Sequence, residues 1–174
     1  MKKKDILISL AIIAACGLSL LFYMQREGFV GIDAGGADAV LRLNGSLFAN
    51  TTINSGTEPA VISARIYRPR HLGLSMGQDG KTWRIESRGP WADLAKIKVR
   101  NNEATALRLG PPFLIKPMVR KNGSLLYIDY AIIGQAGEHY RKFITKNNRT
   151  VTGAKIQIID ETGKVLESGK FKYG

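Results

Sequence analysis

LGLSMGQDGKTWRIES, residues 72–87, has the pattern of a β-hairpin. After the turn at residues 77–80, Trp83 and Ile85 alternate with Arg84 and Glu86. A period of two residues is typical of a strand with one buried face. Turn residues recur about every eight to twelve positions beyond this stretch, which is the spacing of many short strands. Helical periodicity is scarce, so the sequence predicts an all-β protein.

Further strands are predicted on both sides of this hairpin. Residues 39–43 lead into Asn44-Gly45, a favoured two-residue turn, and residues 47–49 are expected to return as its partner. The remaining predicted strands are 60–67, 94–99, 105–109, 113–120, 124–133, 155–159 and 165–173. Of these, 124–133 is apolar on both faces, which is typical of a strand in the middle of a sheet.

Part of this pattern resembles a known class of β-sandwich. The segment from Tyr67 through the turn at 79–81 to Trp83, and the tail at 158–166, are similar to prealbumin-like modules of the carboxypeptidase-regulatory or PEGA type. The resemblance implies an Ig-like or prealbumin-like β-sandwich that serves as a stalk, spacer or binding accessory and has no active site. The Gly110-Pro111-Pro112 break departs from a single module and predicts two stacked subdomains, 38–110 and 111–174.

An uncharged run at residues 6–24 follows three lysines at the start of the chain. At about 1.5 Å of rise per residue, a helix of this length crosses most of a bilayer's hydrocarbon. Basic flanks remain on the cytoplasmic side, so residues 1–26 are expected to form a cytoplasmic tip and a transmembrane helix. The apolar anchor residues are Ile6, Leu7, Leu10, Ile12, Ile13, Leu18, Leu20, Leu21 and Phe22. Residues 27–37 are rich in glycine and are interpreted as a linker.

Cys16 leaves an alternative open. Residues 13–16, Ile-Ala-Ala-Cys, resemble a bacterial lipobox, which would attach a lipid to Cys16 after cleavage. Residues 17–24 stay apolar where a lipoprotein turns polar, which favours a retained helix. In either case we expect a bacterial envelope protein, with the carboxy-terminal domain in the periplasm or outside the cell.

The charge is strongly positive, at +12 for the whole chain. Lys2, Lys3, Lys4 and Arg26 against Asp5 leave 22 basic and 13 acidic residues, a net charge of +9, for residues 27–174. A basic surface beside a membrane attracts anionic lipid, an acidic polymer or a partner protein with an acidic surface, whereas nucleic acid fits this compartment poorly. The candidate docking residues are Arg65, Arg68, Arg70, Arg141, Lys142, Lys146 and Arg149.

No motif predicts catalysis. Residues 73–77 match the G-x-S-x-G nucleophile elbow, but a turn and a strand follow Ser75 where the elbow needs a helix. His71 and His139 are the only histidines and have no neighbouring cysteine or spaced carboxylates, so no metal, cofactor or small-molecule substrate is expected. Asp129 lies among apolar residues, where an ionised carboxylate needs a partner such as Arg108 or Arg120.

These observations favour a non-catalytic accessory or structural subunit of an envelope protein assembly, held in the membrane by its first residues. One alternative is a lipid-anchored module, attached through Cys16, that binds an acidic envelope polymer. The other is a small serine hydrolase that uses Ser75.

Overall fold

The computed structural model describes residues 26–45, 50–151 and 154–171. These residues are almost entirely strands and turns, and their one helical segment is the short 3₁₀ helix η1 (Ala92–Ala95). The strands are β1 (Glu27–Asp33), β2 (Asp38–Asn44), β3 (Asn50–Asn54), β4 (Ala60–Ser63), β5 (Ile66–Gln78), β6 (Lys81–Ser87), β7 (Ile97–Lys98), β8 (Ala104–Arg108), β9 (Leu114–Asn122), β10 (Leu125–Ile133), β11 (His139–Tyr140), β12 (Thr145–Lys146), β13 (Arg149–Thr150), β14 (Lys155–Ile159) and β15 (Val165–Lys170). The all-β prediction is confirmed.

The predicted membrane anchor, residues 6–24, and Cys16 lie outside the described residues. Within the part of the chain that is described, no helix is long and apolar enough to cross a bilayer.

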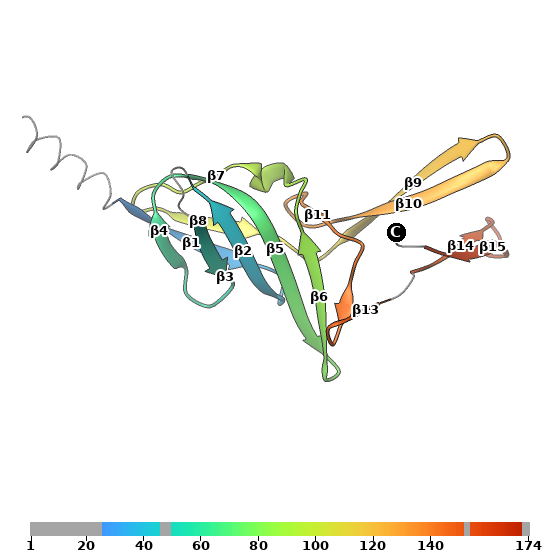
Figure 1. The fold of residues 1–174 in the computed structure, drawn as a ribbon, viewed down its shortest axis with the longest axis horizontal. Helices are drawn as coiled ribbons and strands as arrows, with labels where there is room; N and C mark the ends of the chain where they lie inside the picture. Colours follow the sequence, from blue (N-terminus) through green and yellow to red (C-terminus); the bar gives the residue numbers. More distant parts are fainter. Residues whose placement is uncertain (1–25, 46–49, 152–153, 172–174) are drawn as a thin grey trace, which may run out of the picture.

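Two sheets form the body of the molecule (Figure 1). The larger has the order β13-β12-β6-β5-β2-β3, and β7 also pairs with β5. The smaller has the order β4-β1-β8, in which β1 runs antiparallel to β4 and parallel to β8. The remaining strands form a β11-β10-β9 sheet and a separate β14-β15 hairpin.

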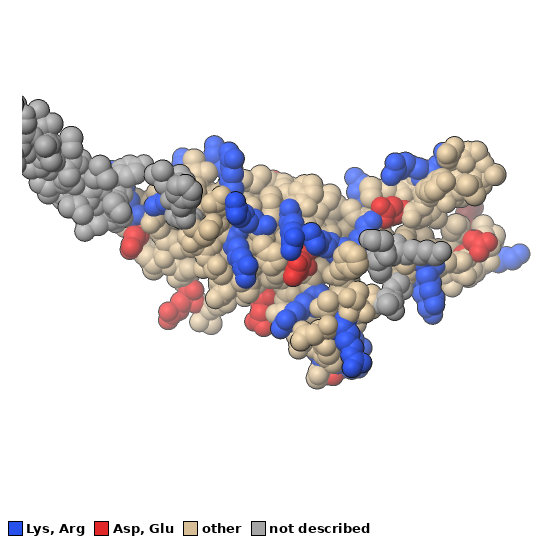
Figure 2. Space-filling view, viewed as in Figure 1, with Lys and Arg blue, Asp and Glu red and all other residues tan. Residues whose placement is uncertain are grey.

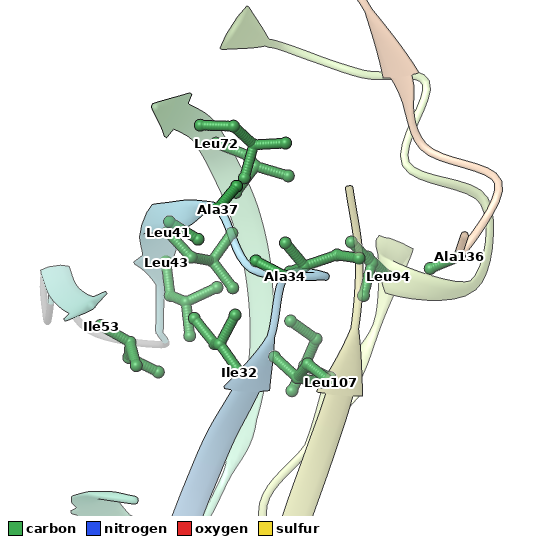
Figure 3. Packing of buried hydrophobic residues seen from close by; sticks show 14 of the residues in the cluster. Ile32, Ala34, Ala37, Leu41, Leu43, Ile53, Leu72, Leu94, Leu107 and Ala136 are labelled. Carbon is green, nitrogen blue, oxygen red and sulfur yellow. The ribbon is translucent and has the colours of Figure 1, made fainter. Parts of the chain in front are cut away.

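The core lies between the two sheets of the body. Ile32 of β1 and Leu107 of β8 point toward Leu41 and Leu43 of β2 and Leu72 of β5 (Figure 3). Burial alternates along β1 and β2, where nearly every second residue is buried. Alternating inward residues on two facing sheets are what defines a β-sandwich core. Each fully buried leucine contributes about 1.5–3 kcal/mol relative to an exposed one.

The buried cluster continues past the Gly110-Pro111-Pro112 break. Tyr130, Ile132, Ala136 and Tyr140 belong to the same cluster as the residues of β1, β2 and β5. The division into subdomains 38–110 and 111–174 stays a prediction.

The glycine-rich stretch predicted as a linker is part of the body instead. Residues 27–33 form β1, which pairs on both sides, and Val30 is fully buried. Gly28 lies against the backbone of Arg100, where a Cβ atom would come within 2.2 Å of the carbonyl oxygen. A glycine at such a position permits a close approach of two backbone segments, here β1 and the connection between β7 and β8, so glycine content does not indicate flexibility.

Other boundaries differ from the predictions. The partner of β2 is β3, which begins at Asn50, while residues 46–49 are not described. The predicted strand at 94–99 begins as η1, which turns Leu94 into the core, and only β7 pairs as a strand. The predicted strand at 60–67 is interrupted at residues 64–65, between β4 and β5.

The predicted hairpin at 72–87 is confirmed, and the predicted strands at 155–159 and 165–173 form a second hairpin in which β15 ends at Lys170, while residues 172–173 lie outside the described residues. In the first, Gln78 pairs with Lys81 across the Asp79-Gly80 turn. In the second, an Asp160 carboxylate oxygen accepts the backbone N–H groups of Thr162 and Lys164, at 2.9 and 3.0 Å, between β14 and β15. An aspartate that binds the following N–H groups is a common way to fix a tight turn.

Candidate functional site

A long hairpin, β9–β10, projects from the body (Figure 1). Its strands pair over their full length, from Leu114 with Ile133 to Asn122 with Leu125. Only Ile132 and Ile133 also pair with β11. We call residues 114–133 the arm. Beyond its base the arm is a two-stranded ribbon, an arrangement that is marginally stable by itself in water.

The outer part of the arm exposes large apolar side chains. Val119, Leu125 and Leu126 are 60%, 60% and 57% exposed, and Tyr127 is 54% exposed. In Figure 2 uncharged residues dominate the outer end of the arm. Monomeric soluble proteins rarely leave such groups of apolar side chains in water, and where they occur they mark interaction sites.

One face of the arm is apolar from its base to the last pair before the tip, where Lys121 lies opposite Leu126. Paired residues share a face of a sheet, so the register places the following side chains together: Ile115, Pro117, Val119, Leu126, Ile128, Tyr130 and Ile132. We call these the inner face. Tyr130 and Ile132 at its base are buried in the core, whereas Val119 and Leu126 at its tip are exposed. The core therefore continues as a surface strip along the arm.

An apolar groove follows the inner face. One part, about 200 Å³ in volume, lies between the base of the arm and the β5–β6 hairpin, where Leu74 and Trp83 line it. A second part, about 440 Å³, lies between the arm and the carboxy-terminal hairpin, where Ile156 and Phe171 line it. The two parts share Ile115, Ile132 and Ile144. The Phe171 ring packs edge-on against the Tyr130 ring, with 4.7 Å between centroids.

A buried carboxylate fixes the base of the arm. Glu138 is completely buried, and its Oε1 accepts the Gly110 N–H and the Tyr140 hydroxyl, both at 2.7 Å. Its Oε2 accepts the Ala136 N–H at 3.0 Å. Burial and the nearby Glu138 carboxyl raise the pKa of Tyr140, so its phenol remains a donor. This network joins the loop before β9 to the loop after β10.

Sequence reasoning missed Glu138. It lies in a short loop among Gly134, Ala136 and Gly137, which reads as an ordinary turn. Gly134 is required there, because a Cβ atom on it would come within 2.1 Å of Glu138 Oε1. A single glutamate between small residues gives no motif that would distinguish a buried carboxylate from a solvated one.

Asp129 has a different partner from the two arginines predicted. It forms an ion pair with Lys142, and the Tyr130 N–H donates to the same carboxylate oxygen at 2.8 Å. These hydrogen bonds, from Lys142 first, lower the pKa of Asp129, and the charge of Arg120 makes a smaller contribution. The side chain is 44% exposed, so it is not the buried carboxylate that its apolar neighbours suggested.

We expect Asp129→Asn to remove a pH-dependent part of the stability. Because the folded-state pKa of Asp129 lies below its ordinary value of 3.8, the ion pair stabilises the fold above that pH, and its contribution is lost as the pH falls through the folded-state pKa. Solvent screening limits the loss in the variant to about 1 kcal/mol at neutral pH. Urea unfolding of both proteins at several pH values measures the difference, and a constant difference down to strong acid would contradict the assignment.

The predicted docking residues fall into two groups, one within residues 65–70 and the other within residues 141–149. Arg65, Arg68 and Arg70 lie just before β5 or in its first half. Arg141, whose N–H donates to the Glu86 carbonyl at 2.8 Å, lies beside β6. Figure 2 shows Lys and Arg spread over the face of β2, β5 and β6, with Asp and Glu between them.

The remaining residues of the second group lie, like Arg141, near the end of the large sheet formed by β6, β12 and β13. Lys142 is engaged with Asp129, and the Lys146 ammonium lies 4.9 Å from the centroid of the Trp83 ring. Arg149 pairs with Lys146 across β12 and β13 and is exposed. That both groups serve one docking surface stays a prediction.

Ser75 lies inside β5, where it pairs with Asp38 on one side and Arg84 on the other. The chain continues as a strand on both sides of it, which is not the strand-to-helix turn of a nucleophile elbow. Among residues 26–45, 50–151 and 154–171, no three His, Cys, Asp or Glu side chains are grouped so that they could hold one metal ion.

Comparison with known proteins gives no family for this chain: it matches no protein-family model, no curated protein and no solved structure at a significant level.

Proposed function

We propose that this protein is a non-catalytic, membrane-anchored accessory or structural subunit of a bacterial envelope assembly, and that it docks a partner protein through the arm. The observation that carries the proposal is the exposed apolar end of a hairpin whose base is fixed in the core. A fixed base and an exposed apolar tip suit a docking element, because the base presents the apolar side chains to a partner and the partner removes them from water.

The exposed apolar surface of the arm favours the binding of a partner. Apolar surface contributes about 25 cal/mol per Å² when it is removed from water, so covering several large side chains stabilises a complex appreciably. Among the described strands, the ribbon has no third member beyond β11, which pairs with only two residues of β10. A partner that covers the inner face would extend the core that Tyr130 and Ile132 begin.

The membrane attachment in this proposal rests on the sequence alone. The uncharged run at residues 6–24 supplies the anchor, and the net charge of +9 over residues 27–174 favours a partner with an acidic surface. Mass spectrometry of the mature amino terminus tests the attachment. An intact start supports the transmembrane helix, whereas an acylated Cys16 at the new terminus supports the lipid-anchored alternative.

Co-purification tests docking through the arm. The full chain is extracted from the membranes of its native cell in mild detergent, as wild type and as Leu126→Glu and Val61→Glu variants. Leu126 and Val61 are 57% and 55% exposed, so the two substitutions are matched in chemistry and accessibility, but Val61 lies on β4 in the body. We expect Leu126→Glu to reduce recovery of the partner by at least about tenfold.

Neither substitution is expected to change the free energy of unfolding by more than about 0.5 kcal/mol, because both sites are exposed. Equal recovery of the partner with wild type and Leu126→Glu would contradict docking through the arm. Equal loss with both variants would show that added negative charge, and not the arm, determines the result.

A further inference from the structure

The outer edge of β9 has no partner strand in the part of the chain that the structure describes. β9 is the last strand in the order β11-β10-β9, and all its residues are exposed. An exposed strand edge offers unpaired N–H and C=O groups to an extended chain, and charged residues and proline on the edge, such as Lys116 and Pro117 of β9, restrict which chains can pair with it. β9 spans nine residues, which is longer than most strands.

Side chains along β9 have different chemistry on its two faces. Ile115, Pro117 and Val119 belong to the inner face, which ends at the tip with Lys121, while Lys116 and Arg120 project from the opposite face. A strand added beside β9 would place its own side chains next to these, alternately on one face and the other. The best complement is apolar on the inner face and acidic opposite the two cations, because opposite charges across strands stabilise a pair.

A second copy of the chain fits this edge poorly. If two β9 strands paired antiparallel over their full length, the pairing would be centred on Met118 and would place Lys116 opposite Arg120 at two positions. Like charges directly opposite each other are destabilising. Pro117 also lacks a backbone N–H, so each copy would remove a hydrogen-bond donor from the ladder. Pairing of β9 with a second β9 is therefore disfavoured, and pairing with an acidic strand is favoured.

We propose that β9 binds an extended segment of the partner protein by strand addition, and that this segment alternates apolar with acidic residues. The inference rests on the proposed function and specifies the chemistry of the partner. Main-chain hydrogen bonds along the edge provide affinity, and the apolar residues of the added strand extend the surface that lines the groove. Lys116 and Arg120 set the preference for acidic residues.

Peptide binding tests the proposal with the full chain in nonionic detergent. The probes are fluorescein-labelled nonapeptides that alternate Val with Glu or Val with Lys, and binding is followed by fluorescence anisotropy. We expect the Val-Glu peptide to bind at least about tenfold more tightly than the Val-Lys peptide. Two further Val-Glu peptides are N-methylated at alternate residues, one in each register, which removes backbone donors and keeps every side-chain charge.

Strand addition predicts that the N-methylated peptide whose methyl groups face β9 binds about tenfold or more weakly than its parent. General attraction between an acidic peptide and a basic protein predicts no such loss. The proposal is overturned if both N-methylated peptides bind like the parent, or if the Val-Lys peptide binds as tightly as the Val-Glu peptide.

Charge reversal on the protein provides the second test. In the Lys116→Glu/Arg120→Glu variant we expect the Val-Glu peptide to bind about tenfold more weakly and the Val-Lys peptide to bind more tightly. The matched control is Lys96→Glu/Lys98→Glu, which makes the same change in net charge at exposed positions between η1 and the end of β7. Equal weakening in both variants would overturn the assignment of Lys116 and Arg120.

Failure of this proposal can be separated from failure of the proposed function. If the Val-Glu peptide does not bind but Leu126→Glu still releases the co-purified partner, strand addition is wrong and docking through the arm stands. If Leu126→Glu releases nothing, docking through the arm is wrong, and the peptide measurements alone then decide whether β9 adds a strand.

Discussion

Replacing Glu138 with leucine is expected to lower the free energy of unfolding by about 4 kcal/mol, because three buried donors lose their acceptor at once. These donors are the N–H groups of Gly110 and Ala136 and the hydroxyl of Tyr140. The leucine side chain fills much of the same space but accepts no hydrogen bond. Urea unfolding of the full chain in detergent, followed by tryptophan fluorescence, measures the change.

Two further variants test whether the loss of stability depends on the buried Glu138 carboxylate. Glu138→Gln keeps one acceptor and is expected to lose about half as much stability. Glu103→Leu removes an exposed glutamate that pairs with Arg100 at 3.1 Å, and it is expected to cost less than about 1 kcal/mol. A loss of less than 1 kcal/mol in Glu138→Leu would show that Glu138 does not fix the base of the arm.

Replacing Gly28 with alanine is expected to cost about 3 kcal/mol, while the same substitution at Gly31 is expected to stabilise the fold by about 0.5 kcal/mol. The two glycines are three residues apart on β1. At Gly28 the new Cβ would lie 2.2 Å from the Arg100 carbonyl oxygen, whereas at Gly31 it would meet no atom within 4 Å from any described residue beyond its two chain neighbours. Equilibrium unfolding of the two variants measures the contrast.

This pair of variants also separates a strand from a linker. If residues 27–33 were a flexible linker, both alanine substitutions would leave the stability of the domain nearly unchanged. A large loss at Gly28 alone is possible only if β1 packs against residue 100 as described.

Much of the fold is predictable because strand periodicity is a local property. Trp83, Ile85 and the Asp79-Gly80 turn together specify the β5–β6 hairpin, and the structure confirms it. The linker prediction is wrong because the role of Gly28 depends on the backbone of residue 100, which is distant in sequence. The predicted strand at 94–99 is wrong over its first residues, because η1 replaces the strand there and buries Leu94.

The candidate site was less predictable for a related reason. Residues 124–133 are apolar on both faces, and that pattern predicts a strand buried within the chain. β10 does lie between β9 and β11, yet Leu125 and Leu126 are exposed. A sequence specifies that a side chain avoids water but not whether its own chain or another one covers it. The sequence therefore predicts the strands of the arm but not that their apolar side chains are exposed, and only the structure identifies the arm as a candidate docking element.

Photocrosslinking in intact membranes tests the central claim most directly. The photoreactive residue p-benzoylphenylalanine is placed at position 126 on the arm or at position 61 on β4, and the native cells are irradiated before lysis. We predict one discrete crosslinked product from position 126, containing a different protein, and none from position 61. Equal crosslinking from both positions, or a product from position 126 that contains only a second copy of this chain, would contradict the claim that the arm docks a partner.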